Sequence, residues 1–135
     1  MDISHENLCP EISIIIPAFN EQKGISDVIK KVKTVMDDSS RYYEVVVIDD
    51  GSKDSTAEKA ENSGSRVISH PYNIGNGAAV KTGIRNAKGK ILVMLDGDGQ
   101  HDPEDIPRML EKIGPYDMVA VSYTHLRAHE TVLDL

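Results

Sequence analysis

Five short runs of apolar residues recur along the chain, and amphipathic stretches separate them. The runs are nearly continuous and rich in β-branched residues, which is typical of parallel strands buried on both faces. They cover residues 12–16, 44–48, 66–68, 91–95 and 118–120. Between the first two, apolar residues recur at helical spacing over 25–36, which predicts an amphipathic helix. The order strand, helix, strand indicates a βαβ unit.

Further helices are predicted between the later strands. The second begins near Asp54 with the capping-box sequence Ser55-Thr56-Ala57-Glu58 and ends at the turn around Gly64. The third covers about 77–87, and the fourth begins at Pro103, because proline is favoured in the first turn of a helix. This alternation predicts an α/β fold with a doubly wound, mainly parallel sheet and helices on both faces.

Polar residues directly follow three of the predicted strands. They are Pro-Ala-Phe-Asn-Glu at 17–21, Asp-Asp-Gly-Ser at 49–52 and Asp-Gly-Asp-Gly-Gln-His at 96–101. Ligands of open α/β sheets bind outside the carboxyl ends of the strands, so these are the segments where a site is expected. The sequence therefore predicts that three acidic clusters converge on one edge of the sheet.

The third cluster carries the residues best suited to a metal ion. Asp96 and Asp98, one residue apart, can face one hard cation, and Gln100 can add a neutral oxygen. Gly97 between them leaves room for a phosphate to approach the backbone. A Mg²⁺ or Mn²⁺ ion held by one or two carboxylates keeps positions open for substrate phosphates. An isolated Asp-x-Asp also occurs as a solvated turn, but its place after a buried strand favours the metal interpretation.

Two other segments have weaker chemical signals. Asp50, at the end of a strand, can accept hydrogen bonds from a base or a ribose, although 49–52 could equally be a turn before a helix. Glycines occur within 73–79, but Val80 stands where a dinucleotide-binding loop or a P-loop needs glycine. Lys81, one turn inside the next helix, is a possible phosphate contact, although such lysines are more often exposed.

Composition and charge narrow the class of protein. Hydrophobic residues at 39% and charged residues at 27% are ordinary values for one globular domain. A net charge of -7 argues against a nucleic-acid partner, which needs clustered Lys and Arg. The single Cys9 cannot form an internal disulfide, which favours a cytoplasmic protein. No apolar run is long enough to predict a transmembrane helix.

Four motifs together resemble the family 2 glycosyltransferases, in particular the branch of dolichol-phosphate mannose synthase and bacterial polyprenyl-phosphate sugar transferases. They lie at 15–21, 46–56, 73–79 and 94–101, in an order and at spacings far more specific than any one motif alone. The resemblance covers roughly residues 11–120. It implies the GT-A type of the doubly wound fold, a UDP- or GDP-sugar donor, and sugar transfer with inversion.

The resemblance also implies roles for individual residues. Pro17, Ala18, Asn20 and Glu21 would line the nucleoside pocket, and Asp50 would meet the base. Asp96, Asp98 and Gln100 would hold Mg²⁺ or Mn²⁺ against the diphosphate, and Asp98 is assigned the catalytic role through that metal. The acceptor would be a polyprenyl (dolichyl-type) phosphate or another nucleophile, so the intact parent is expected at the cytoplasmic face of a membrane.

The last part of the chain departs from the family pattern. After Val121 the expected continuation with its acceptor-binding segment is absent, and 122–135 resembles translated sequencing-adapter read-through. We therefore expect a nucleotide-sugar-binding half at 1–121 and a non-native tail at 122–135. Such a fragment would bind donor and metal without turning over by itself. The missing half would largely set the sugar and the acceptor.

Two other functions fit part of the pattern. A sugar-phosphate nucleotidylyltransferase also places carboxylates and Mg²⁺ on an α/β sheet, but the Gly-rich loop with Arg and Lys that such enzymes carry after the first strand is missing. A regulatory module that binds a nucleotide without catalysis is the second alternative.

Overall fold

The computed structural model describes residues 9–97, 102–113 and 118–120. Within these ranges the chain forms a five-stranded parallel sheet in the order β3-β2-β1-β4-β5. The strands are β1 (Ile12–Ala18), β2 (Tyr43–Asp49), β3 (Arg66–Ser69), β4 (Ile91–Met94) and β5 (Met118–Ala120). The first three strands progress towards one edge of the sheet, and the chain then returns to place β4 on the other side of β1. The strand order therefore reverses between β1 and β4, which is where doubly wound sheets bind ligands.

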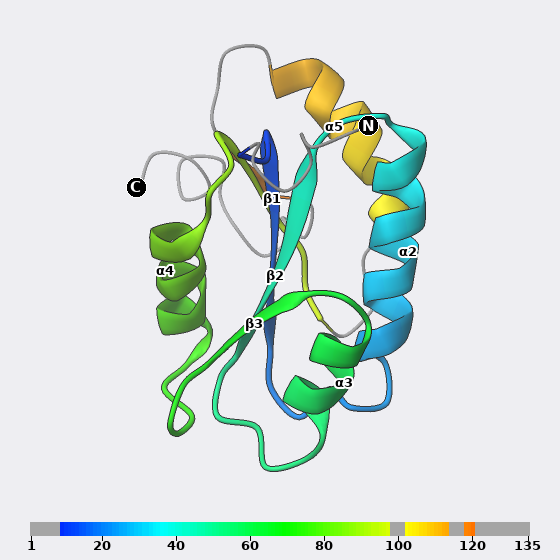
Figure 1. Ribbon diagram of the computed structural model, residues 1–135. Helices are drawn as coiled ribbons and strands as arrows, with labels where there is room; N and C mark the ends of the chain where they lie inside the picture. Colours follow the sequence, from blue (N-terminus) through cyan, green and yellow to red (C-terminus); the bar gives the residue numbers. More distant parts are fainter. Residues whose placement is uncertain (1–8, 98–101, 114–117, 121–135) are drawn as a thin grey trace.

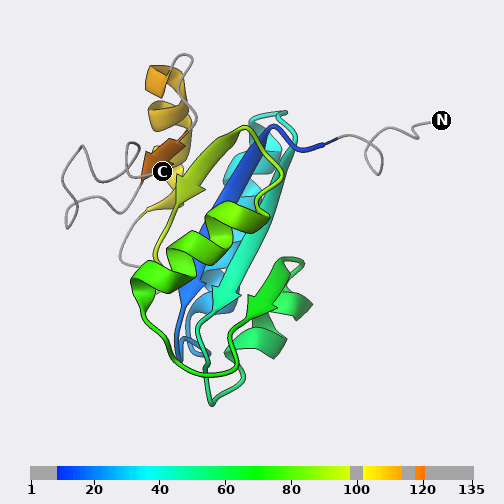
Figure 2. The same cartoon turned by 90° about the vertical axis from the view of Figure 1, so that its left-hand side faces the viewer.

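Helices cover both faces of this sheet, as the sequence predicted. They are α2 (Ile25–Asp38), α3 (Thr56–Asn62), α4 (Asn76–Asn86) and α5 (Ile106–Ile113), and a 3₁₀ turn, η1 (Pro103–Asp105), precedes α5. Figure 1 shows α2, α3 and α5 on one face and α4 on the other, and Figure 2 shows α4 lying across its face of the sheet. None of the helices in the described part of the chain has the length and apolarity that crossing a bilayer requires.

Strand β1 is buried on both faces because it lies in the middle of the sheet. Ile14 and Ile16 point into the core under α2, α3 and α5, whereas Ile15 points into the smaller core under α4. All three side chains are fully buried. This alternation explains why the strand reads as a continuous apolar run in the sequence.

The helix α2 follows its predicted pattern. Its buried residues Ile25, Val28, Ile29, Val32 and Met36 form one stripe. The polar residues between them include Lys30 and Lys31, which are exposed.

The start of α3 differs from the prediction, because the capping box at 55–58 does not form. Ser55 is the N-cap residue, but its side chain caps no amide. Asp54 does so instead, since its Oδ1 accepts a hydrogen bond of 3.0 Å from the backbone N–H of Thr56. The Thr56 hydroxyl bonds the same carboxylate and accepts from the backbone N–H of Glu21 at 2.8 Å. The residue before the predicted cap therefore supplies the carboxylate, and the helix start is tied to the loop after β1.

Candidate functional site at the carboxyl ends of the strands

A pocket of about 470 Å³ lies at the carboxyl ends of β1, β2 and β4, beside the start of α4. It is lined by Pro17, Ala18, Phe19, Glu21, Asp50, Asn73, Gly75, Asn76, Ala79, Asp96 and Gly97. The three polar segments that follow β1, β2 and β4 all contribute to this lining. The structure therefore brings the three clusters together at the point where the strand order reverses.

The loop after β4 approaches the end of β1 closely in this pocket. A Cβ atom on Gly97 would lie 3.1 Å from the carbonyl oxygen of Pro17 and 3.2 Å from the Cβ of Ala18. A side chain at position 97 would thus press on the end of β1. Glycine here serves the packing of the pocket floor, in addition to the room for phosphate that the sequence suggested.

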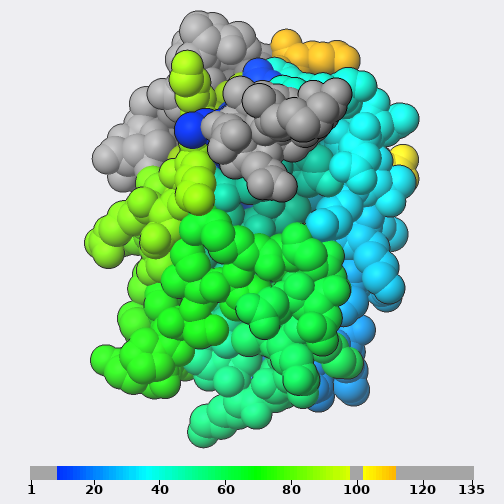
Figure 3. All heavy atoms as spheres, in the orientation of Figure 1, coloured from blue at the N-terminus to red at the C-terminus, as the bar shows by residue number. Residues whose placement is uncertain are grey.

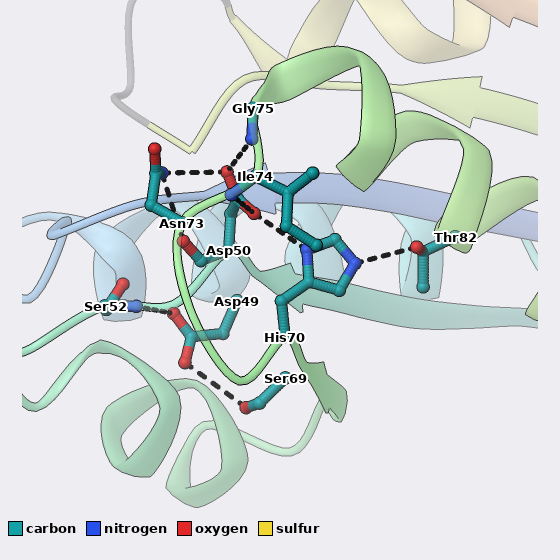
Figure 4. A network of polar contacts seen from close by, with 9 residues as sticks. All are labelled: Asp49, Asp50, Ser52, Ser69, His70, Asn73, Ile74, Gly75 and Thr82. Carbon is teal, nitrogen blue, oxygen red and sulfur yellow. Dashed lines mark hydrogen bonds and ion pairs between the residues drawn. The ribbon is translucent and has the colours of Figure 1, made fainter.

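The carboxylate of Asp50 accepts hydrogen bonds from several groups beside the pocket. Its Oδ1 contacts Nδ1 of His70 at 2.7 Å and accepts from the backbone N–H of Ile74 at 3.0 Å. Its Oδ2 accepts from the backbone N–H of Gly75 at 2.8 Å and from Nδ2 of Asn73 at 2.9 Å. Figure 4 shows these groups surrounding the carboxylate. Asp50 therefore fixes the segment between β3 and α4, which forms part of the molecular surface in Figure 3.

The charge of Asp50 is maintained despite its burial. Only 3% of the residue is exposed, and this desolvation raises the pKa of its carboxyl group. The hydrogen bonds from His70, Ile74 and Gly75 favour the ionised form and outweigh the desolvation, so the pKa lies below its ordinary value. The pocket wall therefore contains a fixed, buried negative charge.

His70 extends this network to helix α4. Its Nε2 lies 2.8 Å from Oγ1 of Thr82 in α4. Strand register explains the contact with Asp50, because Asp49 pairs with Ser69 and the residues after them are therefore neighbours. Asp49 itself holds the turn after β2, since it accepts from the backbone N–H of Ser52 and from the Ser69 hydroxyl.

Asn20 joins two of the loops rather than lining the pocket. It has a positive φ of 54° and is exposed. Its backbone N–H donates to the Ser52 hydroxyl at 2.8 Å, and its Oδ1 accepts from the backbone N–H of Lys53 at 3.0 Å. The side chain that the family pattern assigns to the nucleoside is thus used to hold the loop after β2.

The remaining predicted site residues divide into three groups. Pro17, Ala18, Glu21, Asp50, Asp96 and Gly97 line the pocket. Lys81 is exposed on α4, and the structure does not bring it into the pocket lining. Asp98 and Gln100 lie outside the described residues, as does the predicted tail 122–135, so their roles stay predictions.

Only part of the predicted metal site can be compared with the structure. Within the described ranges, no three His, Cys, Asp or Glu side chains are grouped so that they could hold a metal ion. Asp96 nevertheless lines the pocket at the point where the chain leads towards Asp98. Its carboxylate is the oxygen ligand that Mg²⁺ and Mn²⁺ prefer. Asp96 is therefore the one residue of the predicted ligand set within the described ranges, and the metal site stays a prediction.

Several residues of the pocket were not singled out from the sequence. Phe19 is 42% exposed and lines the pocket, and Asn73, Gly75, Asn76 and Ala79 form the wall at the start of α4. Phe19 is the only phenylalanine of the chain and directly precedes the polar pair Asn20-Glu21, which was the signal available in the sequence. The other four fall in the glycine-containing segment whose phosphate-loop motifs fail.

Comparison with known proteins agrees with this arrangement. The model of glycosyl transferase family 2 matches residues 13–131. An undecaprenyl-phosphate 4-deoxy-4-formamido-L-arabinose transferase of Edwardsiella ictaluri is 37% identical over 115 residues, in a match that covers 80% of this chain and 35% of the relative. A dodecaprenyl-phosphate galacturonate synthase of Rhizobium johnstonii is 33% identical over 109 residues, in a match that covers 76% of this chain and 32% of the relative. The chain thus spans about a third of the length of these relatives.

A solved structure shows the same fold with ligands. Glucosyl-3-phosphoglycerate synthase from Mycobacterium tuberculosis, in complex with Mn²⁺, UDP and glucosyl-3-phosphoglycerate, matches with a TM-score of 0.65 and 30% identity. The match covers 76% of this chain and 39% of that one. The parallel sheet, the pocket at its switch point and the family match over most of the chain lead to one conclusion: this chain belongs to glycosyl transferase family 2.

Proposed function

We propose that this chain binds the nucleotide-sugar donor of a glycosyltransferase together with Mg²⁺ or Mn²⁺. The observation that carries the proposal is the pocket itself, which joins Asp96 and Gly97 after β4 to the loop after β1 and to the wall at the start of α4. Its volume of about 470 Å³ lies in the range of small-molecule sites. The whole protein transfers the sugar to an acceptor, and the family match favours this reaction over nucleotidyl transfer.

The nucleoside lies against the end of β1 and the residue that follows it. Pro17, Ala18 and Phe19 supply apolar surface, and the half-exposed ring of Phe19 can stack on a base. Asp50 faces the same pocket, but a carboxylate has about four acceptor positions, and four protein groups already use them. A base N–H therefore shares Asp50 or replaces the side-chain amide of Asn73, which is an exposed residue.

The diphosphate lies beside Asp96, with the metal between them. Asp96, Asp98 and Gln100 hold the ion, which neutralises the charge that develops on the leaving nucleoside diphosphate. The first turn of α4 has no side-chain cap and borders the same pocket, so its partial positive charge favours an anionic ligand there. Lys81 has no part in this proposal, because its side chain is not among the residues lining the pocket.

The acceptor of the whole protein is a polyprenyl phosphate, and transfer inverts the anomeric carbon. The names of the relatives from Edwardsiella ictaluri and Rhizobium johnstonii support this acceptor class. A phosphate oxygen is already anionic, so this nucleophile needs little help from a base, and positioning against the donor supplies much of the rate. A lipid acceptor would bring the whole protein to the cytoplasmic face of a membrane.

Calorimetric titration of the chain with UDP- and GDP-sugars, with and without Mn²⁺, tests the donor site. We expect binding that requires Mn²⁺, and we expect Asp96→Asn and Asp98→Ala to weaken it by about tenfold or more, since each removes a charged ligand. Asp38→Asn is the matched control, because Asp38 is an exposed carboxylate outside the pocket lining, at the C-terminal end of α2. Absence of nucleotide binding in the presence of Mn²⁺ would refute the proposal.

A further inference from the structure

His70 is a largely buried histidine, and both of its ring nitrogens contact other groups of the protein. Its Nδ1 lies 2.7 Å from Asp50 Oδ1, and its Nε2 lies 2.8 Å from Thr82 Oγ1. The side chains of His70 and Asp50 are 10% and 5% exposed. A histidine in this position has no nitrogen left for a substrate, so its contribution must pass through its two partners.

The partners determine which nitrogen carries a hydrogen. An ionised carboxylate can only accept, so Nδ1 of His70 donates to Asp50. In the neutral ring Nε2 is then an acceptor, and the Thr82 hydroxyl donates to it. In the charged ring Nε2 donates, and the same hydroxyl accepts. A hydroxyl at position 82 therefore fits either state, whereas an apolar side chain fits neither.

These contacts connect Asp50, on one wall of the pocket, with α4, whose start forms another wall. Asp50 holds the amides of Ile74 and Gly75, and Gly75 directly precedes α4. Thr82 lies in α4 itself, two turns after Gly75. His70 therefore contacts α4 through Thr82 and also contacts Asp50, whose carboxylate fixes the start of α4. Figure 4 shows the imidazole between Asp50 and Thr82.

We infer that His70 and Thr82 are positioning residues for the donor pocket. They hold the carboxylate of Asp50 and the start of α4 in one arrangement, and this sets the position of the wall formed by Asn73 and Gly75. The effect on the pocket rests on the proposed function, because it assumes that a nucleotide binds there. The effect on the segment between β3 and α4 does not depend on any ligand.

Three variants and one control test the inference. His70→Phe keeps a ring but removes both nitrogens, and Thr82→Val removes only the hydroxyl. Thr82→Ser keeps the hydroxyl and is the rescue variant. Thr34→Val is the control for the cost of valine in a helix, because Thr34 is an exposed threonine of α2 whose hydroxyl bonds the carbonyl of Lys30 in its own helix.

The first readout is hydrogen exchange of the Ile74 and Gly75 amides in the chain without ligand. We expect exchange to accelerate by about tenfold or more in His70→Phe and by about two- to tenfold in Thr82→Val, as the loss of hydrogen bonds of these kinds implies. Thr82→Ser and Thr34→Val should match the unsubstituted chain. Nitrogen-15 spectra of His70 should show a protonated Nδ1. A ring protonated only at Nε2, or unchanged exchange in both His70→Phe and Thr82→Val, would overturn the inference.

The second readout is the affinity for UDP and GDP in the presence of Mn²⁺. We expect this affinity to fall most in His70→Phe and less in Thr82→Val, by factors similar to those for hydrogen exchange. Thr82→Ser should keep the affinity of the unsubstituted chain. If the unsubstituted chain binds neither nucleotide, the proposed function fails while the exchange experiment still decides the role of His70. If nucleotide binds equally well to Thr82→Val and to the unsubstituted chain, positioning of the pocket is refuted and donor binding stands. Should His70→Phe fail to fold, the comparison of Thr82→Val with Thr82→Ser decides.

Discussion

Replacement of Gly83 by alanine should move α4 away from the sheet. Gly83 is buried where α4 crosses β1, and a Cβ atom there would lie 2.4 Å from Cγ2 of Ile15. Ile15 is fully buried in the central strand, with Val46 and Met94 as its neighbours on either side. It has little room to yield, so the helix must shift instead.

The magnitude follows from two opposing terms. Carbon atoms pack at about 3.5–4.0 Å, so the new methyl group is more than 1 Å too close to Ile15. Overpacking of this kind costs about 1–3 kcal/mol. Alanine gains up to about 1 kcal/mol over glycine in helix propensity. The expected net effect on the free energy of unfolding is therefore a loss of up to about 2 kcal/mol.

Gly77→Ala provides the matched control in the same helix. A Cβ atom there would meet nothing within 4 Å, so only the propensity gain remains. Chemical denaturation of both variants should separate them by about 1–3 kcal/mol, which is the steric cost alone. The nucleotide affinity should fall only in Gly83→Ala, because Asn76 and Ala79 of the pocket wall move with the helix. Equal stability of the two variants would refute the close packing of α4 on β1.

Three further changes test other parts of the structure. Asp54→Ala should destabilise the protein by about 1 kcal/mol in denaturant, whereas Ser55→Ala should change little, because Asp54 and not Ser55 caps α3. Asp50→Asn should lose less stability in acid than the unsubstituted chain does. The folded pKa of Asp50 lies below its ordinary 3.8, so the carboxylate stabilises the fold above about pH 3.8. Denaturation of the unsubstituted chain at several pH values should show this contribution disappearing as the pH falls through the folded pKa. Gly51→Ala should cost about 2 kcal/mol or more in thermal or chemical unfolding, since φ is +75° and a Cβ atom would overlap the backbone of Tyr72.

The elements could be predicted because each follows from a local pattern. The stripe of apolar residues in α2 and the continuous run of β1 each contain enough periodicity to define the element. The capping of α3 could not be decided in this way, since Asp54, Ser55 and Thr56 all offer side-chain oxygens. The contact between Thr56 and Glu21, 35 residues apart, also ties this helix start to the loop after β1, and no local pattern contains it.

The arrangement of the site could likewise be predicted only where it follows from the order of the strands. That three polar segments meet at one edge follows from the parallel arrangement of the strands. The contact between Asp50 and His70 depends on the register of β2 with β3, and the contact between His70 and Thr82 depends on how α4 packs. Neither is visible in the sequence, where His70 is an isolated histidine after a short strand. The positive φ of Asn20 and its bond to Lys53 are hidden for the same reason.

Paramagnetic broadening by Mn²⁺ tests most directly whether metal and nucleotide meet in this pocket. Amide signals of the chain would be recorded with Mn²⁺ alone and with Mn²⁺ plus UDP or GDP. We predict that nucleotide and metal together broaden the signals of Ala18, Gly75 and Gly97 and leave Tyr43 and Gly64, outside the pocket lining, sharp. Broadening centred on another part of the molecule, or none that depends on nucleotide, would contradict the donor site.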